Sequence, residues 1–420
     1  MPVTSSVTSL RLATAGSVDD GKSTLIGRLL YDTKSILADQ LEQVEEASRR
    51  RHGAGAVDLS LLTDGLRAER EQGITIDVAY RYFATAKRRF ILADTPGHVQ
   101  YTRNMVTGAS TADLAIVLVD ARHGVLEQTK RHAYLSSLLG IRHLVLAINK
   151  MDLVAWDEEV FDRIVCEFHE FADGLNDAIE VTYIPLSALE GDNVVEPSEH
   201  MPWYAGPALL EHLETVEVAA DRNLDELRLP VQWVVRPGGS DYRGYAGQIA
   251  SGVVRPGDEV IVLPAGTKTR VKTIDTLDGP LEEAFAGMSV TLLLEDDVDV
   301  TRGDLISHVD DAPTLDREFQ ADVCWMADRP LQPGGRYAIK HATHAARAIV
   351  DELRWVVDVH ALERDETATE LGLNGIGRVR FRTSHPLAFD DYGRNRAMGS
   401  FILIDEATND TVAAGMIRTA

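Results

Sequence analysis

Near the amino terminus, an apolar segment runs directly into a glycine-rich loop, and a helical pattern follows. The apolar segment is Leu10–Ala15, the loop is Gly16-Ser17-Val18-Asp19-Asp20-Gly21-Lys22-Ser23, and apolar residues at helical spacing continue over Thr24–Leu30. The spacing G-x-x-x-x-G-K-[ST] between a strand and a helix predicts a loop whose backbone N–H groups face phosphate oxygens, and the helix dipole favours their negative charge. A chain that begins in this way is expected to fold as an α/β domain around a nucleotide.

Each part of the loop has a predicted role. The Lys22 ammonium should reach the β- and γ-phosphate oxygens, and the Ser23 hydroxyl should be a ligand of Mg²⁺. We expect the whole run to bind the nucleotide: Gly16, Ser17, Val18, Asp19, Asp20, Gly21, Lys22, Ser23 and Thr24.

Strand-like and helix-like segments alternate through the first half of the chain. Such alternation predicts βαβ units and a mostly parallel sheet, here with an antiparallel edge hairpin formed by Val78–Thr85 and Arg88–Asp94. The strands are expected at Leu10–Ala15, Phe90–Asp94, Leu114–Asp120, Leu144–Asn149 and Val181–Pro185, and the helices at Thr24–Leu30, Gln128–Leu139 and Glu158–Phe171.

The pattern changes after the acidic segment Glu214–Arg228, where short strands are separated by turn residues such as Arg236-Pro237-Gly238-Gly239. Short strands at this spacing are typical of small barrels. We therefore predict a phosphate-loop domain over residues 1–225, followed by two small antiparallel β-barrels over residues 226–313 and 314–420.

A second motif, Asp94-Thr95-Pro96-Gly97-His98, follows a buried strand. A carboxylate at a strand end can hold Mg²⁺, and the Gly97 N–H can meet a γ-phosphate. The segment Arg70–Thr75 precedes the edge hairpin, and the hydroxyl of Thr75 is the predicted further Mg²⁺ ligand, beside Ser23 and Asp94.

A third motif, Asn149-Lys150-Met151-Asp152, ends another buried strand, where a base pocket in an open α/β sheet is expected. The Asp152 carboxylate only accepts hydrogen bonds, so it suits the N1–H and exocyclic amino donors of guanine. Asn149 would support the pocket and the base's N7, and the stem of Lys150 would cover the ring. Four polar residues alone are a weak signal, but in this order after the phosphate loop they indicate a guanine site.

Ser187-Ala188-Leu189 follows the last predicted strand, and a backbone N–H of this segment would meet guanine O6. The motifs stand in the order that a GTPase requires. The predicted ligands are therefore GTP and Mg²⁺.

Composition excludes several other classes of protein. The 420 residues include 66 acidic and 42 basic side chains. The formal net charge of −24 opposes sequence-independent binding of nucleic acid. Cys166 and Cys324 are too few for a disulfide framework or a cysteine zinc cluster. No apolar run approaches the ~18 residues that span a bilayer, and residues 1–9 lack the regions of a signal peptide. We expect a cytoplasmic protein with no nucleic-acid partner and no membrane partner.

With a separation of 53 positions from Lys22 to Thr75 (75 − 22) and two barrels, the chain resembles the translation-factor GTPases. Longer strings are similar to a narrower family, the GTPase (large) subunits of bacterial sulfate adenylyltransferase, or ATP sulfurylase. They are Gly16–Leu30, Asp64-Gly65-Leu66, Glu69–Phe83, Gln100–Met105, Leu373–Gly377 and Thr411–Ile417.

This resemblance implies a mechanism. A smaller catalytic subunit would join ATP and sulfate into adenylyl sulfate and pyrophosphate, and GTP hydrolysis by this chain would drive that unfavourable synthesis in sulfate assimilation. His98 would orient the attacking water, Lys22 would neutralise phosphoryl charge, and Val18 with Ile74 would form an apolar gate. Some relatives carry a C-terminal adenylylsulfate kinase domain, but no second phosphate loop occurs here, so no kinase activity is expected of this chain.

Two other functions compete with this one. An elongation factor that carries aminoacyl-tRNA shares the GTP motifs and both barrels, although the net charge of −24, the Asp19-Asp20 pair and the Asp77–Phe83 string count against it. A GTP-dependent scaffold without turnover is disfavoured by His98. The pair His341 and His344 lacks a third metal ligand, so we expect it to be structural.

Overall fold

The computed structural model describes residues 9–36, 39, 42, 44, 46, 48, 58–62, 77–97, 102–175, 179–218, 223–238, 241–359 and 361–419. The chain divides into two compact units, which are considered separately. One comprises Met1–Val218 and Val359–Leu362, and the other comprises Ala219–Asp358 and Glu363–Ala420.

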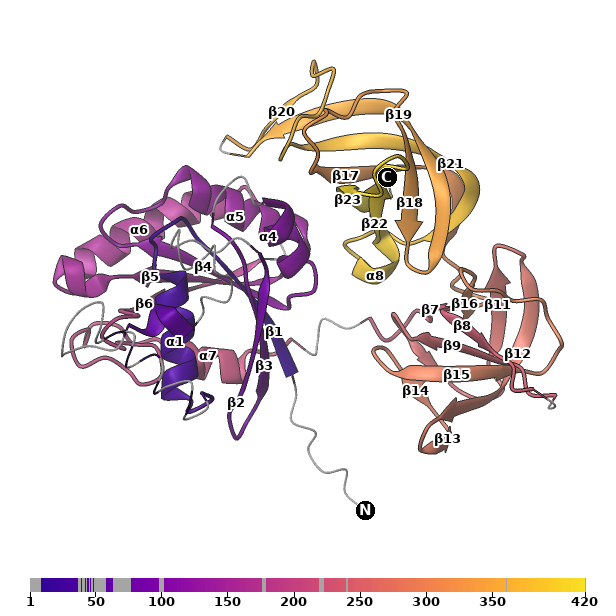
Figure 1. Ribbon diagram of the computed structural model, residues 1–420, viewed down its shortest axis with the longest axis horizontal. Coiled ribbons are helices and arrows are strands. Elements are labelled where there is room, and N and C mark those ends of the chain that lie inside the picture. The colour runs from indigo at the N-terminus through magenta and orange to yellow at the C-terminus, as the bar shows by residue number, and fades with distance from the viewer. Residues whose placement is uncertain are drawn as a thin grey trace. The chain divides into compact units, whose positions relative to one another are not determined.

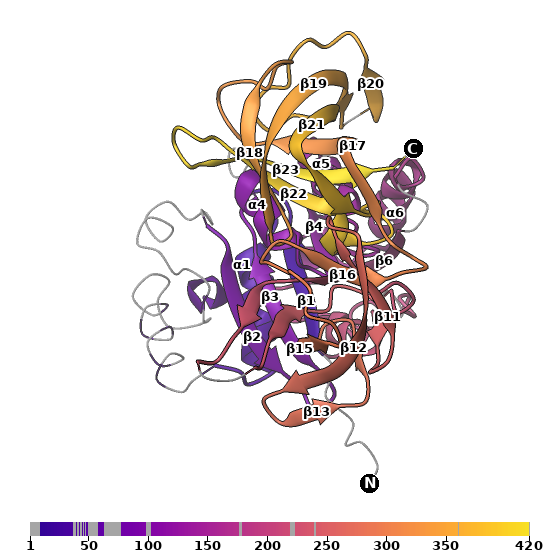
Figure 2. The same cartoon turned by 90° about the vertical axis from the view of Figure 1, so that its right-hand side faces the viewer.

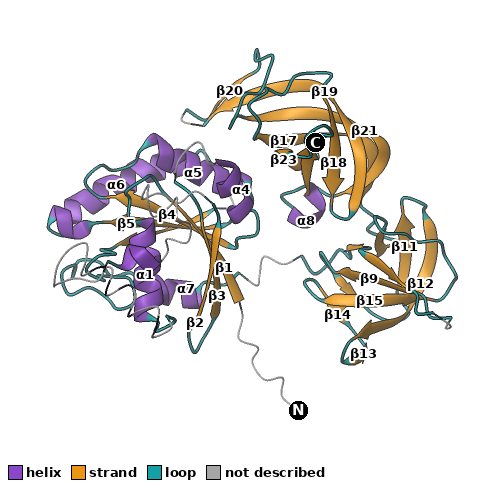
Figure 3. Cartoon of the chain, viewed as in Figure 1, coloured by secondary structure: helices purple, strands orange, loops and turns teal. Residues whose placement is uncertain are grey.

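The first unit is a six-stranded sheet with helices on both faces (Figures 1 and 3). Its strand order is β2-β3-β1-β4-β5-β6, and all neighbours are parallel except the antiparallel edge pair β2 and β3. The elements are β1 (Ser9–Ala15), α1 (Lys22–Asp32), a 3₁₀ turn (Leu59–Leu62), β2 (Ala79–Ala84), β3 (Arg89–Asp94), α4 (Thr102–Ala109), β4 (Leu114–Asp120), α5 (Glu127–Leu138), β5 (His143–Asn149), a 3₁₀ turn (Met151–Val154), α6 (Glu158–Ala172), β6 (Glu180–Pro185) and α7 (Leu209–Thr215).

The sequence explains why these elements form. The central strand β4 reads LAIVLVD and is buried along its whole length, as expected for a parallel strand covered on both faces. Helix α6 begins at a capping residue, Asp157, whose carboxylate accepts a hydrogen bond from the Glu159 N–H at 2.9 Å. Ile164, Phe168 and Phe171 then form its buried stripe at helical spacing. The predicted α/β domain with its edge hairpin is confirmed.

The second unit contains two antiparallel sheets, each around its own apolar core. The first sheet runs in the order β7-β16-β11-β12-β15-β9-β8, with β13 paired to β12 and a separate small pair β10-β14. Its strands are β7 (Leu229–Pro230), β8 (Trp233–Val235), β9 (Gly244–Gln248), β10 (Val253–Val254), β11 (Glu259–Leu263), β12 (Thr267–Thr276), β13 (Gly279–Leu281), β14 (Ala284–Phe285), β15 (Ser289–Leu294) and β16 (Leu305–His308).

The second sheet closes on itself. Its order is β18-β22-β23-β17-β21-β19-β20, and a further pairing between β18 and β19 closes the first six strands into a ring (Figure 2). The elements are β17 (Thr314–Trp325), β18 (Arg336–His341), β19 (His344–Asp358), β20 (Glu363–Asp365), β21 (Ile376–Phe389), α8 (Arg396–Gly399), β22 (Ser400–Ile404) and β23 (Thr411–Arg418). The predicted antiparallel barrels are confirmed, whereas the boundaries at 225/226 and 313/314 stay predictions.

A buried ion pair joins the two sheets of this unit. Arg228 is 2% exposed, and its Nε and Nη2 atoms donate to the two oxygens of Asp390 at 2.8 and 3.0 Å. Arg228 lies beside β7 and Asp390 directly follows β21. A guanidinium buried to this degree requires such a partner, because an unpaired buried charge is very costly.

Among the described residues, no helix has the length and apolar character needed to cross a membrane.

Candidate nucleotide-binding site

Four parallel strands of the first unit end at the same edge of the sheet. Thr14 of β1 pairs in register with Asp94 of β3, and Asp120 of β4 pairs with Asn149 of β5. The chain runs from β1 to β3 on one side and then to β4 on the other side, so the strand order reverses here. Ligands of open α/β sheets bind at such a reversal, outside the carboxyl ends of the strands. The fold thus brings the phosphate-loop and base-pocket motifs to one edge.

The phosphate loop is held in shape by its own groups. The Lys22 Nζ atom donates to the carbonyl oxygens of Gly16 and Ser17, both at 2.8 Å. The Ser17 N–H donates to the Asp20 carboxylate at 2.6 Å, which closes a turn within the loop. Asp19 and Gly21 have φ values of 68° and 93°, in the left-handed region. A Cβ on Gly21 would lie 2.4 Å from the Asn149 amide nitrogen, so only glycine fits there.

The lysine of this loop is buried among acidic side chains. Lys22 is 8% exposed. Burial lowers the pKa of its ammonium, while the nearby carboxylates of Asp20 and Asp94 act in the opposite direction. A bound polyphosphate would add negative charge beside the ammonium and favour its charged form.

Asn149 links the loop to the base pocket. Its side-chain nitrogen donates to the Asp20 carbonyl at 2.7 Å, and its side-chain oxygen accepts from the Ala188 N–H at 2.9 Å. Asn149 is 2% exposed, so both bonds are shielded from water. One side chain therefore fixes the phosphate loop relative to the segment Ser187–Leu189.

Asp152 lies at the predicted base pocket, and a neighbour orients its carboxylate. The Ser187 hydroxyl donates to Asp152 Oδ1 at 2.6 Å. The Ser187 and Ala188 N–H groups already donate within the protein, to the Asp192 carbonyl at 3.1 Å and to Asn149. A backbone N–H of this segment was predicted to donate to guanine O6. Within the segment, that donor would be the N–H of Leu189, or the N–H of Ala188 if it donates to both Asn149 and the base.

Asp120 belongs to the site but was not expected from the sequence. It is 2% exposed and accepts from Lys150 Nζ at 2.8 Å and from the Arg122 guanidinium at 2.6 and 3.0 Å. Burial alone would raise the pKa of its carboxyl, but the hydrogen bonds from Arg122 and Lys150 outweigh burial and hold that pKa below its usual range. Because Lys150 also donates to the Asp19 carbonyl, Asp120 fixes the lysine against the loop.

Arg28 is a second residue of the site that was not expected from the sequence. It lies on α1, and its guanidinium donates to the carbonyl oxygens of Ala188, at 3.2 Å, and Leu189. The signals available in the sequence were the position of Asp120 at the end of an apolar strand and the position of Arg28 in the second turn of the helix after the loop. Arg28 lies within the string Gly16–Leu30 that resembles the narrower family, but no role was predicted for it, and Asp120 lies in none of the quoted strings.

Three predicted site residues, Ile74, Thr75 and His98, lie outside the described residues. Their roles as gate, Mg²⁺ ligand and water-orienting group stay predictions. Val18, the other half of the predicted gate, is 39% exposed on the loop. Asp94 and Thr95 are buried at the end of β3, and the Thr95 hydroxyl donates to the Thr14 carbonyl.

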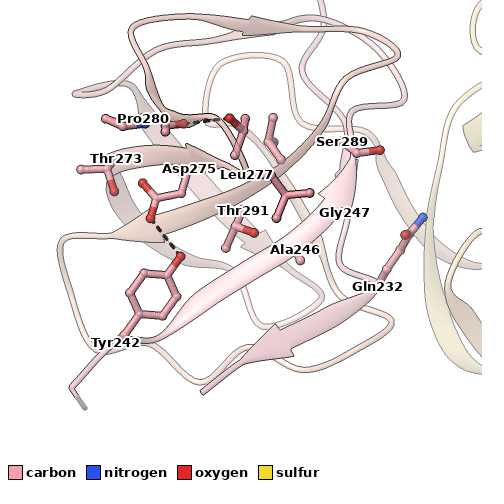
Figure 4. A pocket seen from close by; sticks show the side chains of 13 residues that line it. Gln232, Tyr242, Ala246, Gly247, Thr273, Asp275, Leu277, Pro280, Ser289 and Thr291 are labelled. Atoms are coloured by element: carbon pink, nitrogen blue, oxygen red, sulfur yellow. Dashed lines mark hydrogen bonds between the residues drawn. The ribbon is translucent and has the colours of Figure 1, made fainter. Parts of the chain in front are cut away.

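A cavity of about 860 Å³ lies elsewhere, on the outer side of β9, β12 and β15 in the second unit (Figure 4). Hydroxyl groups of Thr273, Ser289 and Thr291 line it, and the Tyr242 hydroxyl donates to the Asp275 carboxylate at 2.9 Å. The carboxylate would repel a triphosphate, and no motif residue lines the cavity. It is not the nucleotide site.

His341 of the histidine pair packs inside the second unit. His341 is 2% exposed, and its Nε2 atom lies 2.8 Å from the Met398 carbonyl oxygen. The described part of the chain contains no cluster of histidine, cysteine and acidic residues suited to a metal ion.

Comparison with known proteins agrees with this geometry. The model of the Elongation factor Tu GTP binding domain matches residues 8–224, and that of the GTP-eEF1A C-terminal domain-like family matches residues 318–418. The chain is 62% identical over 414 residues to the Bifunctional enzyme CysN/CysC of Mycobacterium tuberculosis, covering 98% of this chain and 67% of that protein.

Two further relatives are named Sulfate adenylyltransferase subunit 1. The protein from Bacteroides fragilis is 55% identical over 97% of this chain and 85% of its own length, and the protein from Alteromonas mediterranea is 54% identical over 97% and 86%. The chain therefore belongs to the family of sulfate adenylyltransferase subunit 1, within the translation-factor GTPase superfamily.

Proposed function

We propose that this chain is the GTP-hydrolysing subunit of a cytoplasmic sulfate adenylyltransferase. Hydrolysis of GTP would drive the synthesis of adenylyl sulfate and pyrophosphate from ATP and sulfate, and a smaller partner subunit would carry out that synthesis. Support comes from the names of the relatives, in which 'subunit 1' implies an enzyme of more than one subunit. The net charge of −24 speaks against a carrier of aminoacyl-tRNA.

The observation that carries the choice of guanine is the orientation of Asp152. Its carboxylate is held by Ser187 at 2.6 Å, at the sheet edge that also bears the phosphate loop. A carboxylate there accepts from the N1–H and amino groups of guanine, whereas adenine presents an unprotonated N1 and would be repelled. The Lys150 stem, fixed by Asp120, would cover one face of the ring.

The residues of the phosphate loop account for triphosphate binding. The N–H groups at the start of α1 and the buried Lys22 ammonium offer positive charge to the β- and γ-phosphates. During phosphoryl transfer, Lys22 would stabilise the charge that builds up on the transferred group. His98 would orient the water, and Val18 with Ile74 would form the apolar gate that keeps that water away before hydrolysis.

Oxygen donors suited to Mg²⁺ lie beside this loop. The Ser23 hydroxyl is in the first turn of α1, and the Asp94 carboxylate is at the end of β3, in register with Thr14 just before the loop. Hydroxyl and carboxylate oxygens are the donors that Mg²⁺ prefers, so the residues fit the ion, with Thr75 as the proposed further ligand. When bound, Mg²⁺ neutralises charge on the β- and γ-phosphate oxygens.

A coupled assay tests the proposal. The purified chain and its candidate small subunit, given ATP and sulfate, should release pyrophosphate much faster with GTP than with a non-hydrolysable GTP analogue. The Lys22→Ala variant serves as the control and should abolish the stimulation by GTP. Equal release with GTP and with the analogue would refute coupling to hydrolysis, and tight binding of aminoacyl-tRNA without stimulated release would favour an elongation factor.

A further inference from the structure

The segment that follows β3 meets the phosphate loop at Gly97. A Cβ on Gly97 would lie 2.4 Å from both the Gly16 carbonyl oxygen and the Lys22 ammonium, so the backbone itself packs on the loop. Gly97 is also the residue before His98, the proposed water-orienting group. The position of the Gly97 backbone therefore fixes the point from which the chain continues to His98.

Gln128 holds the carbonyl group of Gly97. Its side-chain nitrogen donates to the Gly97 oxygen at 2.8 Å. Gln128 lies in the first turn of α5, which is fixed by a hydrogen bond from the Leu126 N–H to the Thr129 hydroxyl at 3.3 Å. The Gly97 carbonyl belongs to the peptide group that joins Gly97 to His98. The bond to Gln128 thus fixes the direction in which the chain leaves Gly97.

His132 orients the Gln128 amide from the other side. Its Nε2 atom lies 3.1 Å from the Gln128 side-chain nitrogen, one helical turn away. That nitrogen only donates, so Nε2 must accept and the ring proton must lie on Nδ1. Burial, with the nearby charges of Lys22 and Arg131, lowers the pKa of His132 to about 3, so the ring is neutral.

Burying the imidazole ring of His132 costs folding free energy. His132 is 3% exposed, and its Nδ1 atom has no hydrogen-bond partner among the described residues. A buried polar atom without a partner destabilises a fold, and an apolar side chain would avoid this cost. Among the described residues, Nε2 is the ring atom that has a hydrogen-bond partner.

We propose that Gln128 is a positioning residue for GTP hydrolysis and that His132 orients its amide. Together they fix the peptide group between Gly97 and His98 against the phosphate loop. This inference rests on the proposed function, because the peptide group that it concerns precedes the proposed water-orienting residue, His98.

The test compares single-turnover GTP hydrolysis with GDP affinity in the full chain. For Gln128→Ala we expect hydrolysis to slow by about tenfold to a hundredfold, as for other losses of positioning, while GDP affinity stays close to that of the starting chain. Gln128→Glu should be equally slow because a carboxylate has no N–H to donate. His132→Leu should be slow, and His132→Gln, whose side-chain oxygen can accept, should recover much of the rate. Lys130→Ala, on the same helix but packed on Phe171, is the control and should hydrolyse GTP normally.

Two outcomes would overturn the inference. One is an unchanged rate of GTP hydrolysis in Gln128→Ala. The other is a Gln128→Ala variant that loses GDP affinity by the same factor as the rate of hydrolysis, which would indicate a purely structural role. A starting chain that binds GTP but never hydrolyses it would refute the proposed function instead. In that case ¹⁵N NMR of His132 decides: a neutral ring protonated on Nδ1, with an Nε2 signal that moves in Gln128→Ala, supports the arrangement, and a proton on Nε2 overturns it.

Discussion

Replacing Asn149 by alanine should weaken both the first unit and its nucleotide site. The change removes the bond to the Asp20 carbonyl at 2.7 Å and the bond from the Ala188 N–H at 2.9 Å. Asp20 is 3% exposed and Ala188 is 1% exposed, so water does not readily replace the lost partner. Each orphaned buried group costs about 1–3 kcal/mol, and we expect the free energy of unfolding to fall by roughly 3 kcal/mol.

Asn193 offers a matched control. It is 3% exposed, its side-chain nitrogen donates to the Pro185 carbonyl at 2.9 Å, and its oxygen accepts from the Ser198 N–H at 2.8 Å. Asn193→Ala should therefore destabilise the chain by a similar amount, but it leaves the phosphate loop anchored. Only Asn149→Ala should also lose GDP affinity, by about tenfold or more, because the loop must then be reordered on binding.

Denaturant unfolding and calorimetric titration with GDP measure the two effects separately. The reasoning is refuted if both variants lose GDP affinity equally, or if Asn149→Ala binds GDP as well as the starting chain. A loss of stability in Asn193→Ala alone would likewise contradict the account of Asn149 as a buried link.

Three further changes test other parts of the structure. Asp152→Asn should shift preference from GTP toward xanthosine triphosphate in competitive binding, because the amide can donate to the 2-oxo group of xanthine; unchanged selectivity would remove the base-pocket assignment. Asp120→Asn should weaken GDP binding several-fold in calorimetry because Lys150 loses its anion, and an unchanged affinity would show that the lysine needs no such anchor. Arg228→Met should lower the unfolding free energy of the second unit by about 3–5 kcal/mol because it leaves Asp390 buried without its partner, and a smaller loss in a variant that replaces both residues would identify the uncompensated charge as the cause.

Much of the fold was predictable because its signals are local. Buried parallel strands such as Leu114–Asp120 are continuous apolar runs. The phosphate-loop motif predicts a strand before it and a helix after it. Strand ends in the second unit depend on pairing across the sheet. The stretch Leu229–Val235 forms two short strands, β7 and β8, because the chain passes here from pairing with β16 to pairing with β9.

The sequence predicts the site residues that belong to a motif. It does not predict those that reach the site only through contacts between distant parts of the chain. Asp152 and Lys22 stand at fixed spacings, so the sequence alone indicates them. Asp120, by contrast, reaches Lys150 across two neighbouring strands, and Gln128 reaches Gly97 across 31 residues of sequence. Such contacts depend on sheet register and helix placement, which no local pattern specifies.

Lys22 and Asp152 together should make this site select a guanine nucleotide. Calorimetric titration of the purified chain with GDP, GTP and ATP in the presence of Mg²⁺ measures that selectivity. Both guanine nucleotides should bind tightly, and ATP should show no measurable binding. Equal affinity for ATP and GTP, or no binding of either, would show that these two residues do not select guanine.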